Sequence, residues 1–67
     1  MTLHVETELE DDGRWIGAVA ELPGVLVYAD TQERAINQAV ALALRVLADR
    51  ADHGEAVALP LTLALVA

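Results

Sequence analysis

A chain of 67 residues forms a single small domain, which we expect to span residues 1–67, and folding at this size buries only about 60% of the unfolded surface. Eleven acidic residues against four basic ones give a net charge of −7, which disfavours direct binding to nucleic acid phosphates or anionic membranes and favours a basic partner. The absence of cysteine excludes a disulfide framework and a cysteine-built zinc site.

We expect a cytoplasmic protein without a signal peptide or a membrane span. Residues 1–8 lack the cationic start and apolar run of a signal peptide, and the long apolar stretch at 56–67 is too short to cross a bilayer. Hydrophobic residues make up 55% of the chain, more than one small core can hide. We therefore expect a homodimer or a higher homo-oligomer.

The first predicted strand covers residues 3–10, where apolar and polar side chains alternate. Its buried side is expected to consist of Leu3, Val5, Thr7 and Leu9, and its outer side of His4, Glu6, Glu8 and Glu10. A tight hairpin is predicted at 11–13, because Asp tolerates and Gly favours a positive φ. The second strand should then pair antiparallel with the first. Both of its faces are apolar: Trp15, Gly17 and Val19 form one, and Ile16, Ala18 and Ala20 the other.

The motif Glu21-Leu22-Pro23-Gly24 predicts a turn, because Pro lacks a backbone donor and Gly permits a conformation that other residues avoid. A third strand is predicted over 25–28. Thr31 is the expected N-cap of a helix over about 32–51, and Gly54 is typical of the position just beyond a helix.

The predicted helix carries an apolar stripe wider than packing on one sheet requires. Its expected centre is Ile36, Val40, Ala43, Leu44 and Leu47, with Leu42 and Val46 on one flank. The extra flank either fits a deep concave sheet or meets another subunit, and we favour the second. The residues expected at that subunit interface are Ile16, Ala18, Ala20, Leu42 and Val46.

A last strand is predicted over 59–66, where leucines alternate with other residues, and Pro60 places it at a sheet edge. The fold class is α+β in the order βββαβ. A right-handed crossover would place the last strand parallel to the first, giving the sheet order 3-2-1-4 with the helix on one face.

Candidate site residues are dominated by carboxylates. Five of them fall within seven positions: Glu6, Glu8, Glu10, Asp11 and Asp12. Divalent-metal chemistry needs acids that converge from several elements, whereas these share one strand and its turn, so we expect no catalytic or metal site and no cofactor. The acids either form a solvated strand face or attract a cationic partner. We expect His4 and His53 at the surface, and Trp15 in packing rather than in ligand contact.

The segment 14–35 reads RWIGAVAELPGVLVYADTQERA and resembles the N-terminal domain of the HicB-like antitoxin family. The similarity covers roughly residues 3–54 and is strongest over Arg14-Trp15, over residues 21–25 and over 31–35. It implies a shortened ribonuclease-H-like fold and a non-enzymatic antitoxin that binds and neutralises a small basic HicA-type ribonuclease toxin. The expected contact residues for that toxin are the five carboxylates.

The chain departs from the family pattern at three positions. Ala20 stands where such sequences often have Pro, Ala29 where they often have Gly, and Ala18 where a charged residue is frequent. Many members also carry a C-terminal DNA-binding domain, whereas we expect a stand-alone form here. The alternatives to an antitoxin are a stand-alone oligomeric module that binds another protein or a small ligand, and a metal-dependent enzyme.

Overall fold

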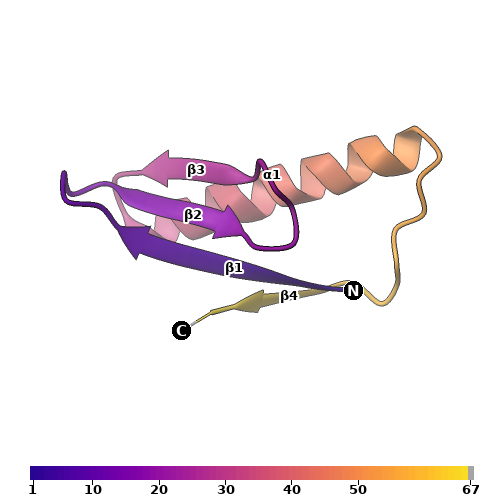
Figure 1. Cartoon of the computed structure of the whole chain (residues 1–67), viewed down its shortest axis with the longest axis horizontal. Coiled ribbons are helices and arrows are strands. Elements are labelled where there is room, and N and C mark those ends of the chain that lie inside the picture. Colours follow the sequence, from indigo (N-terminus) through magenta and orange to yellow (C-terminus); the bar gives the residue numbers. More distant parts are fainter. Residues whose placement is uncertain (67) are drawn as a thin grey trace.

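The computed structural model of the protein describes residues 1–66. A four-stranded sheet is covered on one face by a single long helix (Figure 1). The elements are β1 (Thr2–Leu9), β2 (Trp15–Val19), β3 (Leu26–Ala29), α1 (Gln32–Asp52) and β4 (Thr62–Leu65). The α+β class and the order βββαβ are as the sequence predicts. The third strand lies one residue later than expected, and the last strand is shorter than the alternation over 59–66 indicates.

The strand order is β3-β2-β1-β4, which confirms the predicted topology. β1 pairs antiparallel with β2 and parallel with β4, and β2 pairs antiparallel with β3. In register, Glu6 lies opposite Ala18, and Ala18 lies opposite Leu26. Glu8 likewise lies opposite Ile16, which lies opposite Tyr28. The sheet therefore has two rows that each begin with a carboxylate on β1 and cross two apolar residues.

Local turn chemistry sets both hairpins. The Gly13 N–H donates to the Glu10 carbonyl at 3.0 Å, and Gly13 has a φ of +88°, a conformation that glycine adopts without strain. In the second turn Leu22 N–H donates to the Val19 carbonyl, while the Leu22 carbonyl accepts from Val25 N–H. The Leu22 side chain is almost fully buried, so this turn is anchored in the core.

Helix α1 is capped at both ends by the predicted residues. The Thr31 side-chain oxygen accepts from the backbone N–H of Arg34 at 3.1 Å, which satisfies one of the first-turn donors. At the other end Gly54 has a φ of +87° and its N–H donates to the Ala51 carbonyl. The cap pattern fixes the helix start, and with it which side chains face the sheet.

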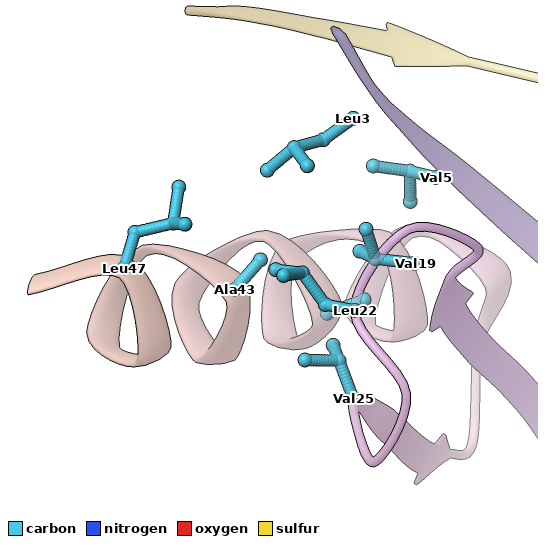
Figure 2. Packing of buried hydrophobic residues seen from close by; sticks show 8 residues of the cluster. Leu3, Val5, Val19, Leu22, Val25, Ala43 and Leu47 are labelled. Atoms are coloured by element: carbon cyan, nitrogen blue, oxygen red, sulfur yellow. The ribbon is translucent and has the colours of Figure 1, made fainter. Parts of the chain in front are cut away.

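The core lies between the sheet and α1 (Figure 2). Leu3 and Val5 of β1 point towards the helix, and Ala43 and Leu47 point back from it (Figure 2). The buried row of the helix is Ala35, Ala39, Ala43 and Leu47. The prediction of the stripe centre is therefore wrong for three residues: Ile36 and Val40 are only partly buried, and Leu44 is 44% exposed. Small side chains occupy the centre because the helix backbone approaches the sheet closely there.

The helix packs against β1, β2 and β3 but not against β4, within residues 1–66. β4 lies at the edge of the sheet beside β1 (Figure 1). Its leucines Leu63 and Leu65 are in register with the buried Leu3 and Val5, yet they are 40% and 59% exposed. The strand thus extends the sheet beyond the part that the helix covers.

Candidate protein-binding face

The sheet face opposite α1, here called the open face, has no covering element within residues 1–66. The sheet alternation assigns it ten of these residues: Thr2, His4, Glu6, Glu8, Ile16, Ala18, Leu26, Tyr28, Thr62 and Ala64. The neighbouring positions Val5, Gly17 and Val19 are buried on the helix side, which establishes the alternation. The open face therefore has carboxylates along β1 and apolar side chains along β2 and β3.

The apolar part of the open face is accessible to a partner. Leu26 is 51% and Tyr28 45% exposed, while Ile16 and Ala18 are half-buried. Ile16 and Ala18 also line a small depression of about 120 Å³ with Glu6 and Glu8. Charged side chains beside exposed apolar ones are the usual composition of a protein-binding surface, in which the charges lie at the rim.

The three remaining candidate acids lie in the β1–β2 turn. Glu10, Asp11 and Asp12 line a second shallow hollow of about 250 Å³. Of these, Asp12 is already paired, because its carboxylate accepts from Arg14 Nε at 2.7 Å and from the Arg14 backbone N–H at 3.0 Å. These hydrogen bonds, the backbone one first, lower the pKa of Asp12. The sequence groups all five acids, but the structure leaves Asp12 the least available to a partner.

Arg14 and Tyr28 belong to the open face, although the sequence does not single them out as site residues. The Arg14 guanidinium lies 4.5 Å from the centre of the Tyr28 ring, within range of a cation–π contact. The antiparallel register of β2 and β3 brings them together, since Ile16 lies opposite Tyr28. Only the strand register could have revealed this pair. This contact places a guanidinium group and an aromatic ring at one end of the open face.

At the other end of the open face, Glu21 ties the β2–β3 turn to β1. Its carboxylate accepts from the His4 backbone N–H at 2.7 Å and contacts His4 Nδ1. The hydrogen bond from the His4 backbone is the main cause of a lowered pKa of Glu21, with the His4 side chain second. The motif Glu21-Leu22-Pro23-Gly24 therefore has a structural part in positioning β1 against the turn.

The five residues predicted at a subunit interface do not form one surface. Ile16 and Ala18 lie on the open face, whereas Leu42 and Val46 pack against the core from the helix. Ala20 is exposed in the turn after β2. The sheet separates the two groups, because the helix covers the opposite face. A symmetric contact could use one group or the other, but not all five together.

Trp15 lies half-buried on the helix side, near the start of α1. It lines an open groove of about 520 Å³ with Leu9, Leu65 and Val66. Gln32, at the first turn of the helix, also lines this groove and donates from Nε2 to the Thr7 hydroxyl at 3.0 Å. The groove runs along the second half of β1, beyond the end of its pairing with β4. Glu6 and Glu8 of β1 also line this groove, so its walls are partly apolar and partly acidic.

Among residues 1–66, no group of three or more His, Cys, Asp or Glu side chains is placed to hold a metal ion. Within the same residues, no helix is both long enough and apolar enough to cross a membrane.

Fold and surface define a small α+β domain with an open, acid-rimmed sheet face. No protein-family model matches the chain, no curated protein matches its sequence, and no solved structure matches its fold.

Proposed function

We propose that the chain is a non-enzymatic, antitoxin-like protein of the cytoplasm, which binds a small basic ribonuclease of the HicA type and masks its active surface. The observation that carries this proposal is the composition of the open face. Glu6 and Glu8 lie in register with Ala18 and Ile16, and Glu10 and Asp11 continue the negative charge to the hairpin tip. A cationic partner would be attracted by the acids and held by the apolar rows.

The charges on this face are available for a partner. No salt bridge involves Glu6, Glu8, Glu10 or Asp11 within residues 1–66. Like charges along one strand repel one another, and a basic partner would relieve that repulsion. The net charge of −7 adds a long-range attraction that salt would screen.

A binding role, rather than catalysis, is supported by how the acids are arranged. Glu6 and Glu8 project from the same strand, and their cross-strand neighbours Ala18 and Ile16 provide no further ligand or nucleophile. A hydrolytic site needs acids or a base that converge on one reacting atom. The open face offers instead a flat surface with charges on one side.

The test is the association of the chain with the protein encoded by the adjacent reading frame, measured on a biosensor at low and high salt. The variant replaces three acids together: Glu6→Gln, Glu8→Gln and Glu10→Gln. We expect its association rate to fall roughly tenfold at low salt, with a smaller change at high salt and in the dissociation rate. A parallel assay follows messenger RNA cleavage by that protein, which wild type should suppress.

The matched control neutralises three acids at the far end of the helix: Asp49→Asn, Asp52→Asn and Glu55→Gln. Both triple variants change the net charge from −7 to −4, so they differ only in where the charge is removed. Equal slowing of both would show that net charge, not the open face, attracts the partner. Absence of any binding or protection by wild type would remove the antitoxin proposal.

The apolar half of the face is tested separately with Tyr28→Ala. Tyr28 is half exposed and contacts Arg14, so its truncation leaves the core intact. We expect a faster dissociation of the complex with little change in the association rate, because apolar contacts act mainly after encounter.

A second candidate function is a stand-alone oligomeric module that binds another protein or a small ligand. The groove beside Trp15 favours it, because Leu9, Trp15 and Leu65 give it apolar walls on the helix side of the sheet. A partner that protects Trp15 fluorescence from a soluble quencher, but whose binding is unchanged by Tyr28→Ala on the open face, would support this candidate over the antitoxin.

A further inference from the structure

The outer edge of β4 presents unpaired backbone groups. The N–H groups of Thr62 and Val66 donate to carbonyls of β1, those of Met1 and Val5. Because successive residues of a strand direct their backbone groups to opposite edges, the N–H and C=O of Leu63 and Leu65 point away from β1. No strand within residues 1–66 pairs with that edge. It is therefore open to the addition of another strand.

The side chains at this edge are apolar and incompletely covered. Leu63 and Leu65 lie on the helix side of the sheet, where α1 does not reach. They are 40% and 59% exposed, whereas Leu61, which precedes them on the same side, packs against the core. Two exposed leucines beside free backbone donors are what a strand-addition site requires.

We propose that two copies of the chain pair antiparallel through β4, joining their four-stranded sheets into one continuous sheet across a two-fold axis. This inference does not depend on the ribonuclease partner. Since the pairing occurs in the plane of the sheet, the open face of each copy stays accessible.

The hydrogen-bond directions restrict the register. Residues that point outward must face one another, so Leu63 of one copy can pair with Leu65 of the other, and the reverse. This arrangement gives about four inter-chain hydrogen bonds and places Ala64 on the axis, opposite its own copy. Paired residues share a face, so the four leucines form one cluster on the helix side. The two leucines that are exposed in a single copy are therefore buried in the dimer.

Charge favours a second copy over a charged partner at this edge. The whole segment 56–67 contains no charged side chain, although the chain carries a net charge of −7. A basic partner would find no acid on β4 itself. The nearest candidate acid, Glu6, is one residue beyond the end of the β1–β4 pairing at Val5 and Leu65. Two copies of Glu6 would be separated by three strand spacings or more, at least about 14 Å, beyond the screening length at physiological salt.

Sedimentation equilibrium of the full chain tests the proposal. We expect a mass near twice 7.1 kDa for wild type, and a shift to monomer for Leu63→Lys, which adds a charge to the edge. The matched control is Leu26→Lys, because Leu26 is similarly exposed on β3, the edge strand at the other side of the sheet. It should remain dimeric. A monomeric wild type, or a Leu63→Lys variant that stays folded and dimeric, would overturn the proposal.

A single cysteine tests the register without weakening the edge. The chain has no cysteine, so Ala64→Cys introduces one thiol. Directly opposed residues of this kind have Cα atoms about 4.5 Å apart, within disulfide range. Mild oxidation should convert Ala64→Cys to a covalent dimer, whereas Ala18→Cys, on the open face, should stay largely uncrosslinked. Efficient crosslinking of Ala18→Cys without that of Ala64→Cys would place the contact on the open face and contradict the β4 pairing.

Discussion

Gly17 of β2 lies directly against the backbone carbonyl of Ala35 on α1. A Cβ atom on Gly17 would lie 2.9 Å from the Ala35 carbonyl carbon and closer still to its oxygen. Helix and sheet backbones therefore meet without an intervening side chain. This contact sets the distance between the two layers, and explains why Ala39 and Ala43, rather than larger residues, continue the buried row.

Gly17→Ala should therefore destabilise the fold. The added methyl group must push α1 away from β2, and overpacking of this kind costs about 1–3 kcal/mol. Domains of this length have a total stability of only about 3–10 kcal/mol, so a clear fall in the urea midpoint is expected. The control is Ala18→Val, which adds bulk to the same strand on the open face. A Gly17→Ala variant as stable as wild type would show that the layers can separate freely.

Leu22 should be, with Leu3, one of the two most costly leucines to shorten. It is 1% exposed and joins the β2–β3 turn to the core beside Val25 (Figure 2). Leu22→Ala would leave a cavity and cost about 2–5 kcal/mol, much of the stability of so small a domain. Leu26→Ala, at a site that is 51% exposed, should cost far less. Urea unfolding followed by circular dichroism distinguishes them, and similar midpoints would contradict the burial.

The strands and the helix start could be predicted because their signals are local. Alternation marks β1, the turn residues mark both hairpins, and Thr31 caps the helix in the structure as expected. The parallel β4 followed from the general handedness of crossovers. None of these predictions requires knowledge of the tertiary contacts between side chains.

The buried helix row and the exposed edge were not predictable in the same way. A helical wheel favours large apolar residues, so it selected Ile36 and Leu44, but the close approach at Gly17 requires small ones. Likewise the alternation in the last strand predicts that its leucines share one face of the sheet. It does not predict that α1 leaves β4 uncovered on that face. The pairing of Arg14 with Tyr28 depends on strand register, which the pattern alone does not determine.

The Thr31 cap should contribute measurably to stability. Thr31→Ala removes the acceptor for the Arg34 N–H, and loss of such a cap costs about 1 kcal/mol. Thr31→Ser retains a hydroxyl at the same position and should recover most of the loss. The measurement is the free energy of unfolding in urea for the three proteins. Equal losses for the alanine and serine variants would mean that the hydroxyl is not what stabilises the helix start.

The Glu21 carboxylate should make the fold sensitive to acid. Its pKa is lowered from an ordinary value of 4.5, chiefly by the hydrogen bond from the His4 backbone N–H. A carboxyl group whose pKa is lower in the folded state stabilises the fold above its unfolded pKa, and that contribution is lost as the pH falls through the folded pKa. Wild type should therefore exceed Glu21→Gln in stability at neutral pH. The difference should shrink below about pH 4.5 and disappear at lower pH.

Urea unfolding of wild type and Glu21→Gln over a pH series measures this difference directly. The control is Glu55→Gln, because Glu55 is exposed and its carboxylate makes no hydrogen bond or ion pair within residues 1–66. Its difference from wild type should be small across the series. If the gap for Glu21→Gln stays constant down to the lowest pH, the charge of Glu21 does not stabilise the contact with β1, and the turn is held by Leu22 alone.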